Sequence, residues 1–553
     1  MLNRRSFLGC GLNAATASLA LSHVASAKRA TAAGVKSFDL EEVTLTELQL
    51  GLESGAFTAR ILVEKYLERI AEIDKRGPAL NAVIELNPEA PAIADALDAE
   101  RRQRGPRGPL HGIPVLLKDN MGTADRMTTT AGSLALSGFI PGKDAGIVRR
   151  LRNRGAVILG KANLSEWANF RSSYSSSGWS GRGGQTRNPY SLDRNPNGSS
   201  SGSAAAVAAN MCVVAVGTET DGSIVGPASA NGIVGIKPTI GLVSRAGIIP
   251  ISHNQDTAGP LCRTVADAAM VLGELAGIDP DDPATRSWNG KSPRNYASFL
   301  TRDGLRGTRI GVVRNSFEFT TAGGNAQGDE LIRSLFDEAV RTVKQEGATL
   351  VDPIEIKSLG KLGESEFEVL LYDFKADLNA YLAGFGASAP VHSLEEIIEF
   401  NERNREKEMP YFGQDIFLKA QEKGERTEKA YRDSLVRSRR LAREEGIDAV
   451  MDNYRLDALI GPTTGPAWLT DLVDGDHDPG GVFPLAAVAG YPNINVPMGF
   501  IFGLPVGVSF FGRAWTEGPL IRMAHSFEQA TRVRKAPAFA TSVELSRQLV
   551  SRD

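Results

Sequence analysis

Cysteine and histidine are scarce in this chain of 553 residues, which contains three cysteines and six histidines. Only Cys212 and Cys262 lie outside the first 27 residues, so a disulfide framework cannot hold a domain of this size together. The sequence leaves open whether these two thiols pair. No C-x-x-C, H-x-x-x-H or H-E-x-x-H spacing occurs, so the common zinc motifs are missing and we expect neither a metal nor another cofactor.

Charge imbalance and long apolar runs are also missing. The 62 Lys and Arg residues nearly balance the 65 Asp and Glu residues, so no overall field favours nucleic acid or an anionic membrane as a partner. No stretch after the N-terminal segment is long and apolar enough to span a bilayer, so we expect no stable membrane insertion. Hydrophobic residues make up 42% and charged residues 23%, which is typical of a globular protein.

The N-terminus has the pattern of an export signal. Arg4 and Arg5 precede a moderately apolar run that ends in Ala25-Ser26-Ala27. A charged start, an apolar middle and a small-residue end are typical of a secretory signal, and the paired arginines indicate the twin-arginine route. We expect a signal peptide at 1–27, a linker at 28–43 and a periplasmic or secreted mature protein.

Strand and helix patterns alternate along the rest of the chain, which predicts an α/β fold with a mixed sheet. Thr44 and Glu47 form a capping-box pattern at the start of the first helix of the mature chain. Residues 355–445 are largely helical and charged, and we expect this region to shape the mouth of the substrate site.

The segment "RNPNGSSSGSAAAVAAN", residues 194–210, contains a motif of nucleophilic serines. Residues 198–202 match G-x-S-x-G, in which Ser200 would be the nucleophile of an α/β-hydrolase. That motif must join a strand to a helix. The preceding "NPYSLDRNPN" cannot be a strand, so the context argues against this interpretation.

Two further nucleophile arrangements have little support. Ser358 and Lys361 form an S-x-x-K, but no S-D-N or K-T-G partner accompanies it. A histidine-based triad is also weakly indicated, because isolated histidines are more often structural than catalytic. His111 lies in "PLHGIP", where a packing or loop role is favoured, and the histidines without a motif context are His253, His392, His477 and His525.

Three separated residues form a better candidate. Lys118 ends the apolar run "GIPVLLK", Ser199 lies in the Gly-Ser-Ser turn, and Ser223 lies in "TDGS". A lysine in a dry site loses its proton more easily, and a neutral lysine is a competent general base. A serine nucleophile needs such a base within reach, directly or through one relay group. The glycine-containing turn at Ser223 can direct successive backbone N–H groups towards an oxyanion.

At these residues the chain resembles the amidase signature family. The resemblance covers "GIPVLLKDN", "GKANLSEWANF", "GSSSGSAAAVAA", "GTETDGSIVGPASANGIVGIKPTIGLVS", "DTAGPLCRTVADAA" and "GYPNINVPMGF". It implies a single large domain at 44–540, followed by a tail at 541–553. It also implies a twisted, mixed, mostly parallel sheet with helices on both faces.

The resemblance implies a Ser-cisSer-Lys triad that hydrolyses amides. Lys118 would be the base, Ser199 the middle serine on a cis peptide bond, and Ser223 the nucleophile, 24 positions after Ser199. The backbone N–H groups of Thr220, Asp221, Gly222 and Ser223 would form the oxyanion hole. Ser200 would have a supporting place beside Ser199.

The motifs depart from the usual family pattern at several positions. The family often reads D-T-G-G-S-I-R, whereas this chain has Glu219, Asp221 and Val225 at the first, third and last of these positions. Asn197 replaces the first glycine of G-G-S-S. These variants resemble the peptide amidase branch, which removes ammonia from C-terminally amidated peptides.

The sequence therefore does not identify which amide is the substrate. It does not indicate the oligomeric state either. We expect a serine hydrolase that cleaves linear carboxamides of small molecules or peptides. One alternative is a glutamine-hydrolysing amidotransferase subunit; the signal peptide argues against it. The other is a periplasmic protein that binds amides or peptides without catalysis, which would need two similar lobes that the sequence does not show.

Overall fold

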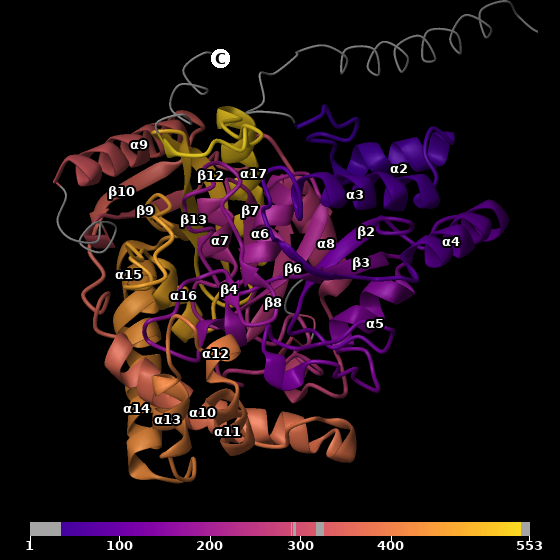
Figure 1. Ribbon diagram of the computed structural model, residues 1–553. Helices are drawn as coiled ribbons and strands as arrows, with labels where there is room; N and C mark the ends of the chain where they lie inside the picture. The colour runs from indigo at the N-terminus through magenta and orange to yellow at the C-terminus, as the bar shows by residue number, and fades with distance from the viewer. Residues whose placement is uncertain (1–34, 289, 291–294, 317–325, 544–553) are drawn as a thin grey trace, which may run out of the picture.

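The computed structural model describes residues 35–288, 290, 295–316 and 326–543. The expected signal peptide at 1–27 lies outside these ranges, as do residues 28–34 of the linker and 544–553 of the tail. The described helices and strands form one α/β domain (Figure 1). The capping box is present, because Thr44 Oγ1 accepts from Glu47 N and Thr44 N donates to Glu47 Oε2.

A mixed sheet of eleven strands forms the centre of the described domain, in the order β1-β3-β2-β6-β8-β7-β12-β13-β11-β9-β10. Parallel pairing joins β3, β2 and β6 in one group and β11, β9 and β10 in another. Antiparallel pairing lies between the two groups and at the β1 edge. The strands of this sheet are β1 (Val83–Leu86), β2 (Pro114–Lys118), β3 (Val157–Ala162), β6 (Val214–Glu219), β7 (Val234–Lys237), β8 (Thr257–Cys262), β9 (Arg309–Val313), β10 (Thr349–Ile354), β11 (Ala458–Pro462), β12 (Asn493–Ile501) and β13 (Leu504–Phe511), while β4 (Trp179–Ser180) and β5 (Gly184–Gln185) pair separately.

Helices cover both faces of this sheet. Every residue of β2, β3, β6, β7, β8 and β13 is buried, and successive side chains of a strand point to opposite faces. Both faces are therefore shielded from water, as expected. The helices are α2 (Leu45–Ser54), α3 (Ala59–Ile73), α4 (Ala90–Arg104), α5 (Gly146–Asn153), α6 (Ser201–Ala208), α7 (Val225–Ala230), α8 (Val265–Leu275), α9 (Ala326–Gln345), α10 (Gly363–Ala383), α11 (Leu394–Arg403), α12 (Arg405–Glu408), α13 (Asp415–Gln421), α14 (Lys429–Ala442), α15 (Asp448–Tyr454), α16 (Phe483–Ala489) and α17 (Glu517–Thr531).

The small-residue helix α6 packs very closely against the sheet. All eight of its residues are buried, and it contacts β1, β2, β3, β6 and β8. A Cβ atom at Gly202 would lie 2.2 Å from the carbonyl oxygen of Ala82 and 2.5 Å from that of Asn163. Larger side chains cannot fit there, so the composition of α6 allows its N-terminus, with Ser199 and Ser200, to lie deep in the domain.

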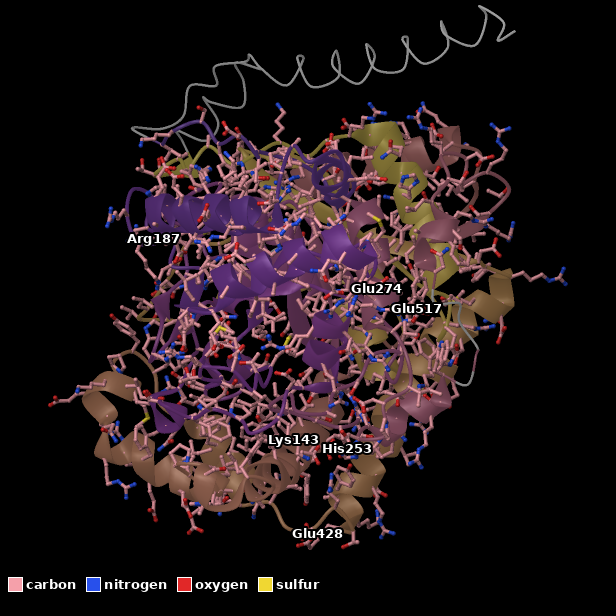
Figure 2. The ribbon with its side chains drawn as sticks, turned by 90° about the vertical axis from the view of Figure 1, so that its right-hand side faces the viewer. Lys143, Arg187, His253, Glu274, Glu428 and Glu517 are labelled. Atoms are coloured by element: carbon pink, nitrogen blue, oxygen red, sulfur yellow. The ribbon has the colours of Figure 1, made fainter. Side chains whose placement is uncertain are left out.

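Helices α10, α11, α13 and α14 gather at one end of the molecule (Figure 1). Helices α10, α11 and α13 enclose a hydrophobic core that also includes Trp167 and Phe170, from the loop that follows β3. Charged side chains of both signs are interspersed over the molecule, and His253 lies beside this helical end (Figure 2). Within the described ranges, no helix has the length and hydropathy needed to cross a membrane.

Candidate active site

Lys118 is the last residue of β2 and is completely buried. Its Nζ lies 2.7 Å from Ser199 Oγ, 2.9 Å from Thr218 Oγ1 and 3.2 Å from Thr218 O. Burial lowers the pKa of Lys118 from 10.5 to about 7, although Asp256 and Glu219 partly oppose this shift. A substantial fraction of this amine is therefore neutral at neutral pH.

Ser199 lies in the tight turn before α6 and is completely buried. The peptide bond between Gly198 and Ser199 is cis. The carbonyl oxygen of Ser199 accepts from Ser165 N at 3.1 Å, and Ser201 Oγ donates to Asn197 O at 2.6 Å. These contacts hold the turn so that the hydroxyl of Ser199 faces the end of β2.

Ser200 occupies a different place from the nucleophile of an α/β-hydrolase. It precedes the first residue of α6, and no strand leads into it. Its Oγ donates to Thr218 O at 3.1 Å, and its N donates to Ser223 O at 3.2 Å. Ser200 therefore joins the Ser199 turn to β6 and to the Ser223 turn, as a supporting residue would.

Ser223 lies between β6 and α7 and is 7% exposed. The backbone hydrogen bond from Ser200 is the link that brings its turn beside Ser199. Among the described residues, Ser223 Oγ has no hydrogen bond to Ser199 Oγ. Hydrogen bonds between catalytic groups are often long in a site without substrate, so the two hydroxyls must approach further for direct proton transfer.

The turn at 220–223 offers backbone donors. Within the described part of the chain, the N–H groups of Thr220, Asp221 and Ser223 have no hydrogen-bond acceptor. Gly222 adopts φ +75°, a conformation that glycine favours, and a Cβ atom there would lie 2.7 Å from the ring of Phe483. The turn can therefore direct N–H groups towards a substrate oxyanion.

Glu219 supports the same turn from the end of β6. Its Oε2 accepts from Ile224 N at 2.7 Å and from Val225 N at 3.0 Å. Burial raises the pKa of Glu219, and the nearby Lys237 acts in the opposite direction. The family often has aspartate at this position. The longer side chain of Glu219 still accepts hydrogen bonds from the backbone N–H groups that follow Ser223, the proposed nucleophile.

Thr218 and Asn120 are site residues that we did not predict. Thr218 Oγ1 accepts from both Lys118 Nζ and Asn120 Nδ2, the latter at 3.0 Å. Thr218 precedes the TDGS turn by two positions, and Asn120 follows Lys118 by two. Their closeness to the motif residues was the only sequence signal for them.

Asp256 links the Ser223 turn to the loop that directly precedes β8. It accepts from Thr220 Oγ1 at 2.6 Å and from the backbone N of Ile251 and Ser252. Burial raises the pKa of Asp256 to about 6.

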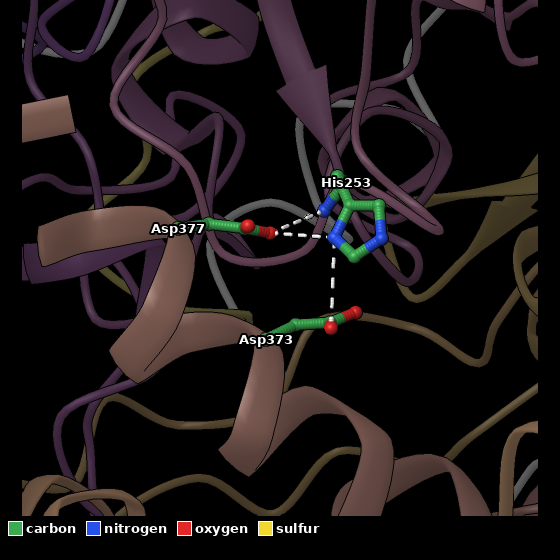
Figure 3. Close-up of side chains that lie close together, drawn as sticks. All are labelled: His253, Asp373 and Asp377. Atoms are coloured by element: carbon green, nitrogen blue, oxygen red, sulfur yellow. Dashed lines mark hydrogen bonds and ion pairs between the residues drawn. The ribbon is translucent and has the colours of Figure 1, made fainter. Parts of the chain in front are cut away.

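The loop held by Asp256 is tied in turn to α10. His253 Nδ1 lies 2.8 Å from Asp377 Oδ2 and 3.5 Å from Asp373 Oδ1 (Figure 3). The ligand atoms of these three residues lie within 4.8 Å of one another, a spacing that could suit a metal ion. Arg426 also reaches Asp377, at 2.8 Å. Asp377 thus contacts both His253 and Arg426, which joins the loop at 251–256 to α10 and to the segment before α14.

A cavity of about 230 Å³ adjoins the partners of Lys118. Its lining extends from exposed His253 and Asp281, past half-buried Asp256, to buried Thr218. Among the described residues, neither Ser199 nor Ser223 lines it. The cavity therefore approaches the candidate site from the side of Thr218 and Asn120.

The other nucleophile arrangements are not assembled. Ser358 is buried whereas Lys361 is exposed, and Ser358 Oγ reaches Glu445 O at 3.5 Å. The ring of His111 contacts Leu97 O, and that of His525 contacts Thr301 O. The exposed His392 and His477 pair with Glu396 and Asp471.

Cys212 and Cys262 are both free thiols and both buried. Burial raises the pKa of Cys212 to about 12 and that of Cys262 well above its ordinary value. The question that the sequence left open is thereby answered, because the two cysteines do not pair.

The chain matches known amidases over nearly its whole described length. The family model described as Amidase matches residues 61–521. A probable amidase of Arabidopsis thaliana is 43% identical over 512 residues, which cover 91% of this chain and 93% of the relative. A glutamyl-tRNA(Gln) amidotransferase subunit of Halorhodospira halophila is 35% identical over 504 residues, 89% of this chain and 98% of the relative.

Solved structures agree with this assignment. The native peptide amidase from Stenotrophomonas maltophilia is 50% identical, with a TM-score of 0.85 over 91% of this chain and 99% of that one. These matches argue against the alternative of a binding protein without catalysis. The chain belongs to the amidase signature family and is a hydrolase that acts on the carbon–nitrogen bonds of amides.

Proposed function

We propose that this protein is a serine amidase that cleaves linear carboxamides through Lys118, Ser199 and Ser223. The observation that carries the proposal is the contact of 2.7 Å between Lys118 Nζ and Ser199 Oγ, whose side chains are both completely buried. A neutral lysine has two N–H groups and one lone pair. The two oxygens of Thr218 match the two N–H groups, which leaves the lone pair directed at the hydroxyl of Ser199.

Proton transfer then runs through the middle serine. Lys118 takes the proton of Ser199 while Ser199 takes the proton of Ser223, and Ser223 Oγ attacks the carbonyl carbon. Backbone N–H groups of the 220–223 turn stabilise the oxyanion. The proton returns through Ser199 to the leaving nitrogen as the C–N bond breaks, so the amine leaves neutral and an ester to Ser223 remains. Water hydrolyses that ester by the same relay, and these steps use only protein groups and water.

The preferred substrate in this proposal is a C-terminal peptide amide, which releases ammonia. The 50% identity to a peptide amidase supports this choice. The test is ammonia release from four classes of compound: peptide amides, aliphatic amides, aryl amides and glutamine. Peptide amides should give the highest kcat/KM, and inactivity on all four would overturn the proposal.

A glutamine-hydrolysing amidotransferase subunit is the second candidate. The 35% identity to a glutamyl-tRNA(Gln) amidotransferase subunit favours it. The glutamine arm of the same assay separates the two. Glutamine turnover above that of peptide amides, increased by added partner subunits, would favour the second candidate.

We also propose that the protein is exported to the periplasm or beyond, because Arg4 and Arg5 precede an apolar run that ends in a small-residue cleavage pattern. Cell fractionation and N-terminal sequencing should find mature protein that starts after Ala27. Arg4→Lys/Arg5→Lys should retain the precursor in the cytoplasm. Equal export of that variant would contradict the twin-arginine route.

A further inference from the structure

Asp221 places a carboxyl group on the turn that we assign to the oxyanion hole. Its side chain faces Glu366 of α10, and Glu366 is hydrogen-bonded to it. Glu219 of β6 and Asp478 of the loop before α16 add negative charge nearby, and Lys237 of β7 adds positive charge. Three acidic neighbours against one basic neighbour make an ionised Asp221 unfavourable at this position.

The contacts of Gln255 show which carboxyl group accepts hydrogen bonds. Gln255 Nε2 donates to Glu366 Oε1 at 2.8 Å and to Thr220 O at 3.3 Å. Glu366 Oε1 is therefore satisfied by an amide donor. A hydrogen bond between the two acidic side chains requires one proton between them, and burial raises the pKa of Glu366 to about 7 as well. The proton is better placed on the partner whose other oxygen lacks a hydrogen bond.

The other oxygen of Asp221 agrees with this assignment. Asp221 Oδ1 is buried and has no hydrogen-bond partner among the described residues. An ionised carboxylate with a buried, unpaired oxygen is strongly unfavourable, whereas the carbonyl oxygen of a neutral carboxylic acid is tolerated better. Burial, followed by the charges of Glu366 and Glu219, raises the pKa of Asp221 well above its usual range.

Lys237 does not satisfy Asp221 by a direct contact. Its Nζ donates to Pro238 O at 3.2 Å, and its charge is shared with Glu219 and Glu517 as well as Asp221. Burial also lowers the pKa of Lys237 to about 8. This lysine therefore offsets only part of the negative charge around the turn.

We propose that Glu366 is a positioning residue that holds Asp221 in its neutral, protonated form, so that no side-chain charge opposes the oxyanion formed at Ser223. The inference rests on the proposed function. An ionised Asp221 would place negative charge on the same residue whose N–H group faces the oxyanion, and such a charge would weaken transition-state stabilisation. In this proposal Asp221 and Glu366, which lie on separate segments of the chain, together keep negative charge away from the oxyanion.

The pH profile of kcat for ammonia release tests this role. Glu366→Gln removes the charge of the partner and supplies an N–H donor, which favours ionised Asp221. We expect kcat at alkaline pH to fall by at least about tenfold, with the alkaline limb moved to lower pH. The double variant Glu366→Gln/Asp221→Asn should regain most of the lost kcat, because an amide side chain at position 221 cannot ionise. Glu364→Gln, which changes an 86% exposed side chain of the same helix, is the matched control and should keep the wild-type profile.

A second measurement does not depend on activity. Infrared difference spectra should show a protonated-carboxyl band that disappears in Asp221→Asn and persists in Glu364→Gln. A wild-type profile in Glu366→Gln, or an unchanged carboxyl band in Asp221→Asn, would overturn the inference. Absence of ammonia release by the wild-type enzyme would instead count against the proposed function, while the infrared result would still report the charge of Asp221.

Discussion

Lys118 Nζ and Ser199 Oγ lie 2.7 Å apart although 81 positions separate the two residues in the chain. The contact depends on the close packing of α6 against β2 and β6, which brings the turn before α6 to the end of β2. Thr218, from β6, holds the lysine on its other side. The proposed base and its proposed relay are thus positioned by the core of the domain rather than by a surface loop.

The three serines of the site should respond differently to alanine. Ser223→Ala should abolish acyl-enzyme formation and lower kcat by at least about 10³-fold, because it removes the attacking oxygen. Ser199→Ala should lower kcat by about 10²–10⁴-fold through loss of the relay. Ser200→Ala should cost less than either, because its hydroxyl joins backbone segments without contacting Lys118.

Single-turnover kinetics with a chromogenic amide or ester checks this order. A Ser200→Ala variant that is more impaired than Ser199→Ala would contradict the assignment of the relay.

Activity should fall as pH decreases. The pKa of Lys118 is lowered to about 7, so the neutral amine predominates above that pH and the inactive ammonium form below it. We expect kcat to fall about tenfold for each pH unit on the acid side. Initial rates from pH 5 to 9, with the melting temperature measured at each pH, separate this effect from unfolding. A flat profile between pH 5 and pH 8 in a folded enzyme would exclude Lys118 as the base.

Gly222→Ala should damage both the turn and the reaction. The residue adopts φ +75°, and an added methyl group would lie 2.7 Å from the ring of Phe483. We expect a loss of about 1–3 kcal/mol of stability and a large fall in kcat, because the oxyanion donors would move. Chemical denaturation and steady-state rates measure the two effects.

Gly363→Ala, at the start of α10, is the control for that experiment. No heavy atom lies within 4 Å of its added methyl group, so stability should be equal or slightly higher. Equal tolerance of alanine at both positions would contradict the described conformation of the turn.

Reducing agents should not affect stability, because Cys212 and Cys262 are buried, free thiols. For mature protein without residues 1–27, the melting temperature with and without dithiothreitol should agree within about 1 °C. A thiol reagent should label both cysteines only after unfolding. A clear loss of stability on reduction would indicate a disulfide that this structure does not contain.

The sequence was sufficient to predict the α/β fold and to select the three residues proposed as the triad. Lys118, Ser199 and Ser223 each lie within short motifs whose chemistry can be recognised, and α6 shows its close packing through its run of small residues. The G-x-S-x-G match at Ser200 was resolved by local context, because no strand precedes it. These features depend on neighbouring residues, which a sequence displays directly.

The supporting groups could not be predicted in the same way. Glu366 lies more than a hundred positions from Asp221 and has no motif around it, and the same is true of Asp373 beside His253. Their roles arise from α10 packing against the loop at 251–256. Such contacts depend on tertiary packing between distant segments, which hydrophobic periodicity does not specify.

The most direct measurement of the central claim is the location of a covalent adduct. The mature enzyme is treated with a fluorophosphonate at pH 8, digested and analysed by tandem mass spectrometry. Our account predicts a single modified residue, Ser223, with labelling slowed strongly in Lys118→Ala and absent in Ser223→Ala. An adduct on Ser199 or Ser200, or undiminished labelling of the Ser223→Ala variant, would contradict it.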